Sequence, residues 1–299
     1  MARKLYSIYG ALLANVVIAI IKFAASVFTN SSSMFAEGIH SLVDTINQLL
    51  LLYGLKRSKK PPDKTRPFGY GKELYFWSFI VSILIFGLGG GISIYQGIIH
   101  IFHPLQSENL GWNYAVLGFS VLFEGGSLVV ASREFNKVRN GLSWWQAIVK
   151  SKDPSTFLVL FEDGASVLGL FIVFVFMLLR NAYQIDYLDG LASVLVGMLL
   201  VASSAILARE SRSLLLGEGL SPRTQEKIRL LVETDEAVQK LQRLYSTYQS
   251  PDEVLLMMQV AFYPHLETGE ITASIDRITA RIKSEFSMIR YVILQPESL

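Results

Sequence analysis

The stretch Glu37-Gly-Ile-His-Ser-Leu-Val-Asp44 carries three ionisable side chains within a run that is otherwise apolar enough to cross a membrane. On a helix, residues three, four or seven positions apart share one face, so Glu37, His40 and Asp44 are predicted to point the same way. An Asp at the centre of a bilayer costs about 2.5 to 3.5 kcal/mol on insertion scales, and such residues usually face a bundle interior and mark ion or substrate paths. The stretch therefore predicts a functional site inside a membrane-embedded helix bundle.

The composition of the whole chain agrees with a membrane protein. Of its 299 residues 51% are hydrophobic and 17% are charged, against roughly 25% charged in a soluble domain. The formal net charge is +2, and the basic residues gather in a few loops, so nucleic acid is not an expected partner. The chain has no Cys, which excludes disulfides, thiolate metal ligands and cysteine nucleophiles.

Six runs of about 20 apolar residues are long enough to cross a bilayer core about 30 Å thick. They cover roughly residues 6–28, 33–55, 74–102, 112–133, 155–179 and 184–208. The first run is too long for the apolar core of a signal peptide, so we read it as a retained span. Lys and Arg crowd the loops after spans two and four, whereas the opposite loops offer only Arg180. Cytoplasmic loops are enriched in Lys and Arg, so both termini are predicted to be cytoplasmic.

The last part of the chain reads as a small soluble domain. Ser221 followed by Pro222 is a helix start signal, and Pro251-Asp252 marks a hairpin turn. We predict a helix over 222–234, strands over 237–247 and 253–263, a helix over 269–286 and a strand over 289–295. The predicted fold is thus an all-α six-helix membrane bundle over residues 1–209, followed by a cytoplasmic α+β domain of αββαβ, ferredoxin-like order over 210–299.

A second predicted span also carries carboxylates inside its apolar run, at Glu162 and Asp163. Successive helical residues differ by about 100°, so only one of the two can face the bundle centre squarely, and we favour Asp163. Together with His40 and Asp44 it would supply one imidazole and two carboxylates, a set suited to zinc and other first-row divalent ions. Four-coordination would need one more ligand.

A single polar residue inside a membrane can instead form an interhelical hydrogen bond that fixes packing. Joint occurrence favours a metal: five ionisable residues on two spans would cost on the order of 10 kcal/mol if unpaired. No Lys or Arg lies in the middle of either helix, so a bound cation would supply the missing charge. The candidate metal ligands are Glu37, His40, Asp44, Glu162 and Asp163.

Polar positions in other spans give weaker signals. Lys22 lies near enough to the end of span one to extend its ammonium group to the membrane surface. Asn15 and Glu124 sit within apolar runs, and each could be a packing residue, a proton-path residue or an outer partner of the site.

The outer helix ends carry two further polar residues. Asp189 opens span six, where a helix cap is favoured over a proton acceptor, and His100 is interpreted as incidental. Span three contains a run of glycines that predicts close helix packing rather than a phosphate-binding loop. These are Gly87, Gly89, Gly90 and Gly91.

The six spans, the His-Ser-Leu-Val-Asp of span two, the Asp of span five and the terminal αββαβ domain together resemble the cation diffusion facilitator family. Further matching pieces are residues 28–34, 66–72 and 213–220, and Glu162-Asp163 resembles the branch that contains the mitochondrial zinc transporter of animals. The resemblance implies a homodimer that exports Zn²⁺, or Mn²⁺, Co²⁺, Ni²⁺ or Fe²⁺, from the cytosol in exchange for protons. It also implies that His40, Asp44 and Asp163 are transport-site ligands.

The chain departs from the family pattern at several positions. Val159 stands where the second ligand of span five usually lies, so Glu162, Glu37, Asn47 or a water would replace it. Arg66 stands where many members have a His, and we expect no second metal site in that loop. The terminal domain offers only His265, so we expect no regulatory metal there and assign its role to dimerisation.

A proton and a metal ion would compete for such a site, because imidazole and carboxylates bind metal only when deprotonated. The main rival is a non-transporting dimeric scaffold, supported by the ligand missing at Val159. An intramembrane metalloenzyme ranks last, since no His-Glu-x-x-His pair occurs. We expect no enzymatic activity and no prosthetic group. With no targeting extension visible, a bacterial cytoplasmic membrane is the expected location.

Overall fold

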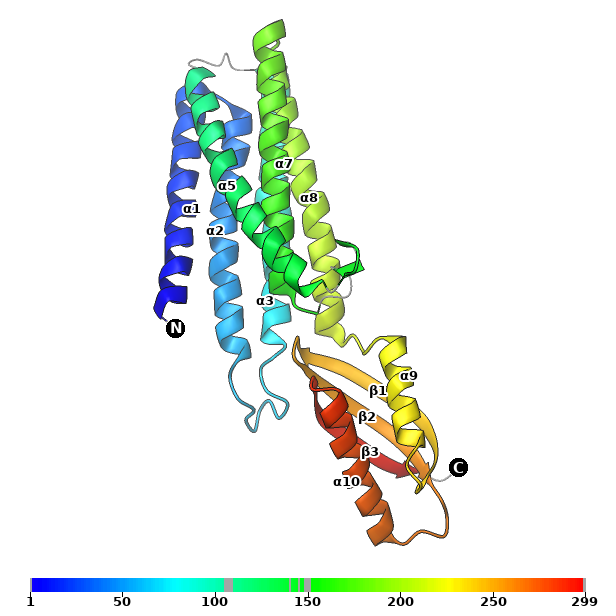
Figure 1. Ribbon diagram of the computed structural model, residues 1–299. Helices are drawn as coiled ribbons and strands as arrows, with labels where there is room; N and C mark the ends of the chain where they lie inside the picture. Colours follow the sequence, from blue (N-terminus) through cyan, green and yellow to red (C-terminus); the bar gives the residue numbers. More distant parts are fainter. Residues whose placement is uncertain (1, 105–109, 140, 145, 148–151, 298–299) are drawn as a thin grey trace. The chain divides into compact units, whose positions relative to one another are not determined.

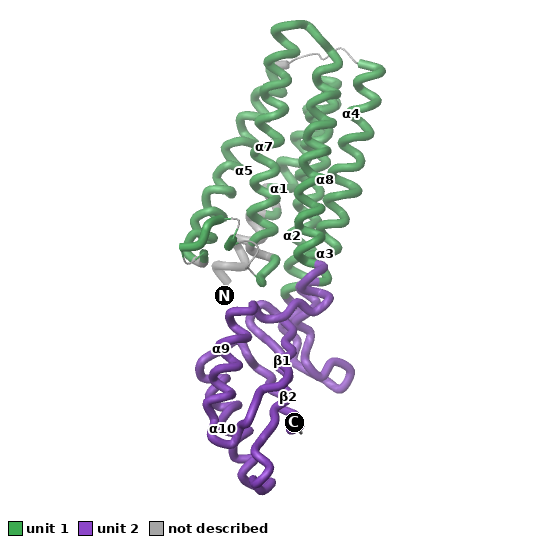
Figure 2. The backbone as a smooth tube through the Cα atoms, turned by 90° about the vertical axis from the view of Figure 1, so that its right-hand side faces the viewer, with its two compact units in different colours: residues 1–55, 76–211 green, residues 56–75, 212–299 purple. Residues whose placement is uncertain are grey.

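The structure is a computed structural model that describes residues 2–104, 110–139, 141–144, 146–147 and 152–297. The chain forms two compact units (Figure 2): unit 1 comprises Met1–Leu55 and Phe76–Ser211, and unit 2 comprises Lys56–Tyr75 and Arg212–Leu299. The sequence puts the domain boundary at 209/210, two residues before the break at Ser211. The loop between the second and third helices, expected with the bundle, groups instead with unit 2.

Long helices form unit 1 (Figure 1). Each predicted span overlaps a helix or, in span three, a helix interrupted by a π-helical segment, η1. The elements are α1 (Ala2–Thr29), α2 (Ser32–Ser58), α3 (Glu73–Leu84), η1 (Ile85–Gly91), α4 (Ile92–Phe102), α5 (Leu110–Val138), α7 (Pro154–Tyr183) and α8 (Tyr187–Leu216).

Four segments among the described residues are long and apolar enough to cross a membrane. They are Glu73–Phe102, Gly111–Lys137, Phe157–Tyr183 and Tyr187–Leu216. In α1 the described apolar part is the shorter segment Asn15–Thr29. Helix α2 is long enough, but its ionisable residues lower its hydropathy. The structure thus confirms a multi-span membrane unit with at least these four apolar helices.

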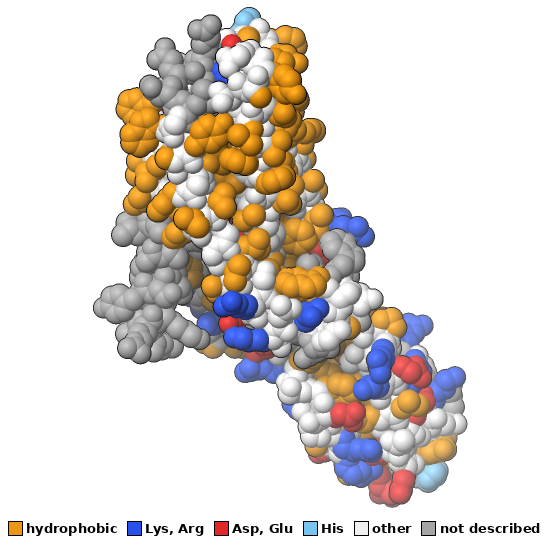
Figure 3. All heavy atoms as spheres, turned by 45° about the horizontal axis from the view of Figure 1, so that its top comes forward, with side chains coloured by type: hydrophobic (Ala, Val, Ile, Leu, Met, Phe, Trp, Pro, Cys, Tyr) orange, Lys and Arg blue, Asp and Glu red, His pale blue; other side chains and the backbone are white. Residues whose placement is uncertain are grey.

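The interior of unit 1 is packed with aliphatic side chains such as Leu158, Leu170 and Val196, all fully buried. Its outward faces also carry large apolar side chains: Leu122 is 78% exposed and Phe171 is 63% exposed. Figure 3 shows apolar side chains over much of the visible surface of these helices. A helical unit that is apolar inside and outside is suited to a lipid environment.

Glycines bring span three close to α8, although not all of the predicted ones take part. A Cβ atom on Gly90 would lie 3.0 Å from the carbonyl oxygen of Gly197, and one on Gly97 would lie 2.7 Å from that of Gly190. By contrast, a Cβ atom on Gly87 would meet nothing within 4 Å. Close packing is therefore confirmed at Gly90, and it depends on glycines of α8 that the sequence analysis did not single out.

Unit 2 has the predicted order of elements. They are α9 (Pro222–Glu233), β1 (Val238–Ser250), β2 (Glu253–Phe262), α10 (Thr268–Glu285) and β3 (Ile289–Glu297), and every boundary lies within three residues of its prediction. Strand β2 is central, antiparallel to β1 and parallel to β3, because α10 carries the chain back across the sheet. As expected, the Ser221 side chain accepts a hydrogen bond from the Thr224 amide at the start of α9.

Both helices of unit 2 cover one face of the sheet. Leu256 and Val260 of β2 are completely buried against Ile228 of α9 and Ile278 of α10. Tyr75, in the first turn of α3, is part of the same core, and the preceding loop belongs to unit 2 as well. Unit 2 therefore has a small hydrophobic core of its own.

Candidate functional site

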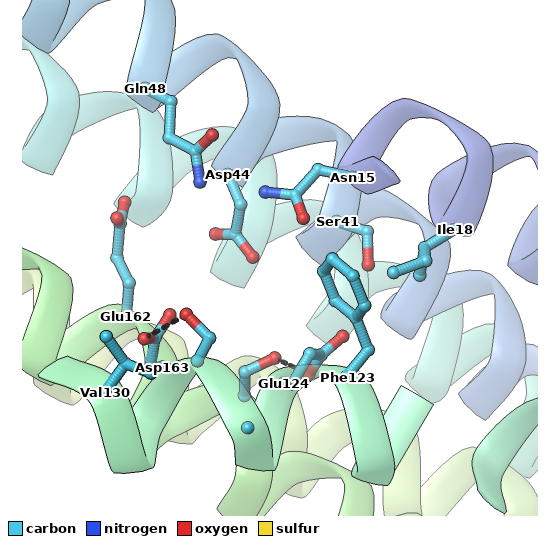
Figure 4. A pocket seen from close by; sticks show the side chains of 13 residues that line it. Asn15, Ile18, Ser41, Asp44, Gln48, Phe123, Glu124, Val130, Glu162 and Asp163 are labelled. Carbon is cyan, nitrogen blue, oxygen red and sulfur yellow. Dashed lines mark hydrogen bonds between the residues drawn. The ribbon is translucent and has the colours of Figure 1, made fainter. Parts of the chain in front are cut away.

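A cavity of about 320 Å³ lies inside unit 1 where α1, α2, α5 and α7 come together (Figure 4). Three of the five predicted site residues line it: Asp44, Glu162 and Asp163. The full lining is Asn15, Ile18, Ser41, Asp44, Gln48, Phe123, Glu124, Gly126, Ser127, Val130, Glu162, Asp163 and Ser166. Glu37 and His40, the other two predicted site residues, are not among the lining residues.

On α2, helical spacing brings two of the predicted residues together. The Nε2 atom of His40 lies 3.4 Å from Oδ1 of Asp44, one turn later on the helix. His40 is only 2% exposed, and its Nδ1 atom has no hydrogen-bond partner among the described residues. An imidazole and a carboxylate therefore share the α2 face, with Asp44 directed into the cavity.

On α7, both acidic residues reach the cavity, whereas the sequence predicts that only one faces the bundle centre squarely. Glu162 turns toward α2, where its Oε1 atom accepts a hydrogen bond of 2.6 Å from Nδ2 of Asn47. Asp163 turns toward α5, where its Oδ2 atom accepts one of 2.8 Å from the Ser127 hydroxyl. Val159 is 37% exposed and does not line the cavity. The two carboxylates are thus held by neutral donors on different helices.

Lys22 does not extend to the membrane surface as expected. Its side chain is completely buried, and its Nζ atom lies 2.9 Å from Oε2 of Glu37 and 2.7 Å from Oε1 of Glu124. The other oxygen of Glu124 accepts a hydrogen bond from the Ser166 hydroxyl. A positive charge that α2 and α7 do not themselves supply therefore comes from α1, and Glu37 already has a cationic partner.

Among the residues that the structure describes, no three of the His, Asp and Glu side chains lie close enough to hold one metal ion together. Figure 4 shows why: Asp44 is on one wall of the cavity, and Glu162 and Asp163 are on another. These residue types are nevertheless suited to divalent first-row ions. The cavity therefore presents two partial ligand sets that face each other across a gap.

Asp189 caps a helix, as favoured from the sequence, but the helix is not its own. From the first turn of α8 its carboxylate accepts hydrogen bonds from the backbone amides of Ser32 and Ser33, at 2.5 and 3.3 Å, at the start of α2. The Ser31 hydroxyl donates a third, at 2.8 Å. His100, interpreted as incidental, has its Nδ1 atom 3.5 Å from the same carboxylate. Asp189 thereby fixes the beginning of the helix that carries His40 and Asp44.

Comparison with known proteins identifies the class to which this fold and cavity belong. A family model described as the cation efflux transmembrane domain matches residues 8–216, which is most of the chain. The chain therefore belongs to the cation efflux family.

Two relatives illustrate the similarity. The proton-coupled zinc antiporter SLC30A9, mitochondrial, of Xenopus laevis is 39% identical over 81% of this chain and 44% of its own length. Metal tolerance protein C4 of Arabidopsis thaliana is 31% identical over 84% of this chain and 56% of its own. The chain thus spans less than half the length of the Xenopus relative.

Unit 2 also matches solved structures, including the nickel form of a MamM CTD variant. That match has a TM-score of 0.25 and 14% identity, and it covers 26% of this chain and 99% of the other.

The relatives contradict the expected bacterial cytoplasmic membrane, since the animal proteins are mitochondrial by name. The prediction was wrong because the distribution of Lys and Arg orients helices in a membrane without identifying which membrane it is.

Proposed function

We propose that this protein carries divalent cations across a membrane, with Zn²⁺ as the principal substrate and protons moving in the opposite direction. Membership of the cation efflux family supports metal transport. The similarity to a zinc antiporter, at 39% identity, supports the choice of ion and the proton coupling. The observation that carries the proposal is the cavity itself, with Asp44, the neighbour of His40, on one side and two carboxylates of α7 on the other.

The proposed ligands are His40 and Asp44 of α2 with Glu162 and Asp163 of α7. Glu162 replaces the second ligand of span five, whose usual position is occupied here by Val159, because Glu162 lines the cavity and Val159 does not. Neither Glu37 nor His40 is among the lining residues. Glu37 is left out of this set because its carboxylate is already paired with the Lys22 ammonium, whereas His40 lies next to Asp44.

Transport would require the two partial ligand sets to close on the ion and to separate again. A movement of α7 against α2 would do this, and opening the cavity toward one membrane face and then the other would complete a cycle of alternating access. Protons would displace the metal because a neutral imidazole and ionised carboxylates are needed to bind it. We further propose six membrane spans with both termini cytoplasmic, and a homodimer.

The test is ion flux into proteoliposomes under an imposed pH gradient, comparing Zn²⁺, Mn²⁺, Co²⁺ and Ni²⁺. We expect Zn²⁺ flux to be lost in His40→Ala and in Asp163→Ala. The matched controls are His103→Ala, an exposed residue beyond the end of α4, and Asp276→Ala, an exposed residue of α10, both of which should transport normally. Absence of flux of every ion in correctly folded wild-type protein would overturn the proposal.

One observation favours the scaffold alternative: no group of three ligating side chains has gathered among the described residues. A scaffold would bind no stoichiometric metal at the cavity. Calorimetric titration of the purified protein with Zn²⁺ separates the two functions, since only the transporter is expected to bind about one ion per chain.

A further inference from the structure

The ammonium group of Lys22 lies between two carboxylates that have different access to the cavity. Glu37 of α2 is completely buried and is not part of the cavity lining. Glu124 of α5 retains 13% exposure of its side chain and lines the cavity together with its partner Ser166. One cation thus bridges a carboxylate that is closed off from the cavity and one that is open to it.

Glu124 also acts on the proposed ligands. It lines the same cavity as Asp44 of α2 and Asp163 of α7, and Figure 4 shows the three carboxylates around that cavity. A divalent ion held between Asp44 and Asp163 would therefore be attracted to Glu124 as well. The family pattern gave no reason to include this residue, because it lies on α5.

Two further observations indicate that this part of the cavity is built for a cation. The Lys22 ammonium, 2.7 Å from Oε1 of Glu124, is itself a cation bound to that carboxylate. In addition, Nδ1 of His40 is buried without a hydrogen-bond partner among the described residues, and the buried Oδ1 of Asp44 has the imidazole Nε2 atom of His40 at 3.4 Å but no hydrogen bond there. Such atoms are costly unless a ligand reaches them.

We propose that Glu124 is a further residue that contacts the transported divalent cation, and that Lys22 competes with this cation for Glu124. The inference rests on the proposed transport function. It gives Glu37 a definite role, which is to keep Lys22 paired while Glu124 turns to the ion. A buried ammonium left without any partner would be strongly destabilising, so a second carboxylate makes the exchange of partners feasible.

The competition determines how tightly the ion is held. While the ion occupies the cavity, Glu124 contributes to its binding; as the ion leaves, Lys22 takes Glu124 back and lowers the affinity of the empty cavity. A transporter needs this balance because an ion bound too tightly would not be released.

The decisive comparison is Glu124→Gln with Glu37→Gln, each made alone and in combination with Lys22→Met. Each glutamine substitution removes one negative charge and one partner of Lys22, and only Glu124 lines the cavity. Titration of the purified full-length protein with Zn²⁺ should show affinity weakened about 10- to 100-fold in Glu124→Gln, the range reported for residues that support metal sites. Glu37→Gln alone should also weaken binding, because Lys22 then has no second carboxylate among the described residues when Glu124 turns to the ion. Adding Lys22→Met removes this constraint, so Lys22→Met/Glu37→Gln should bind Zn²⁺ about 10- to 100-fold more tightly than Lys22→Met/Glu124→Gln. Equal affinities in the two double variants would overturn the inference.

A second pair of variants tests the competition by Lys22. In Lys22→Met the ion gains Glu124 without a competitor, so we expect Zn²⁺ to bind at least about tenfold more tightly while the maximal flux falls. The double variant Lys22→Met/Glu37→Gln removes one charge of each sign and covers the case in which the single variant does not fold. Affinity equal to wild type in folded double variant would contradict the competition.

These results separate the inference from the proposed function. If the proposed transport function is wrong, neither wild type nor any of the variants is expected to bind or transport Zn²⁺. If wild type binds Zn²⁺ and transports it while Lys22→Met/Glu124→Gln binds it as tightly as Lys22→Met/Glu37→Gln, only the role of Glu124 fails.

Discussion

Two neighbouring regions in the interior of unit 1 differ in how the negative charge of their acidic residues is compensated. Around Lys22, two carboxylates share a buried ammonium group at 2.7 and 2.9 Å. Across the cavity, the hydrogen bonds that Glu162 and Asp163 receive from the described residues come from the neutral side chains of Asn47 and Ser127. The protein therefore supplies its own cation in one region and leaves the other to be filled.

The difference also changes the energetic argument for a metal. Counting every acid on α2 and α7 as unpaired overstates the missing charge, because Glu37 is compensated from α1. What remains is concentrated at Asp44, Glu162 and Asp163, all of which line one cavity. A divalent ion would neutralise two of these three charges, so its binding is favoured where the protein offers no cation of its own.

The largest effect is expected from the uncompensated region. Asp44→Ala removes the carboxylate that both lines the cavity and pairs with His40, and we expect Zn²⁺ flux in proteoliposomes to fall at least about 100-fold. The control is Thr45→Ala, because Thr45 does not line the cavity and its hydroxyl donates to the backbone carbonyl of Ser41 in the same helix. Equal flux in the two variants would remove Asp44 from the transport site.

In the compensated region the expected loss is in stability. Lys22→Met leaves two buried carboxylates without their cation, which should lower the free energy of unfolding by about 3 to 5 kcal/mol. Thermal unfolding of the full chain in detergent measures this loss. Restoring the charge balance in Lys22→Met/Glu37→Gln should recover part of it, and an unchanged melting temperature in Lys22→Met would contradict the ion pairing described here.

A third way of stabilising a buried acid occurs at Asp189, which has the α2 amides and serine hydroxyls instead of a full cation. Asp189→Asn retains the shape but loses charge-assisted acceptors, so we expect about 2 kcal/mol of destabilisation. Asp186→Asn is the control, because Asp186 is 38% exposed and its pairing with Arg180 should be worth about 1 kcal/mol or less. The same melting temperature for both variants would argue against a special role for Asp189.

The sequence predicted what depends on local periodicity. Hydrophobic runs gave the long helices, and alternation with turn signals gave every element of unit 2 to within three residues. The same helical period correctly put His40 beside Asp44. These features are local, because they need only the spacing of residues along one element.

The sequence failed where partners come from different helices. Lys22 and Glu124 are 102 positions apart, and Ser32 and Asp189 are 157 apart, so no periodic pattern links them. The one available signal was the occurrence of Lys22 and Glu124 in separate apolar runs, since two opposite charges that are both expensive in a membrane stabilise each other when paired. That signal indicates a partnership without saying which of several acids takes part.

The smallest expected effect on stability is that of Asp235 in unit 2, because this buried acid lies at the edge of a water-exposed domain. Burial disfavours ionisation of Asp235, yet hydrogen bonds from Arg277, Ser274 and the Ala237 amide outweigh it and hold the pKa of Asp235 below its ordinary value. A lowered pKa in the folded state means that the ionised carboxylate stabilises the fold above the unfolded-state pKa of about 3.9. This stabilisation is lost as the pH falls through the folded-state pKa.

Asp235→Asn should therefore lower the stability of unit 2 by about 1 kcal/mol at pH 7, since Arg277 is 55% exposed and water weakens its contribution. The difference from wild type should shrink as the pH is lowered below about 4, where the wild-type carboxyl group also becomes neutral. Far-UV circular dichroism of the full chain in detergent, recorded during heating at several pH values, measures it. A difference that stays constant between pH 7 and pH 3 would mean that Asp235 acts through shape rather than charge, and would set it apart from the acids of unit 1.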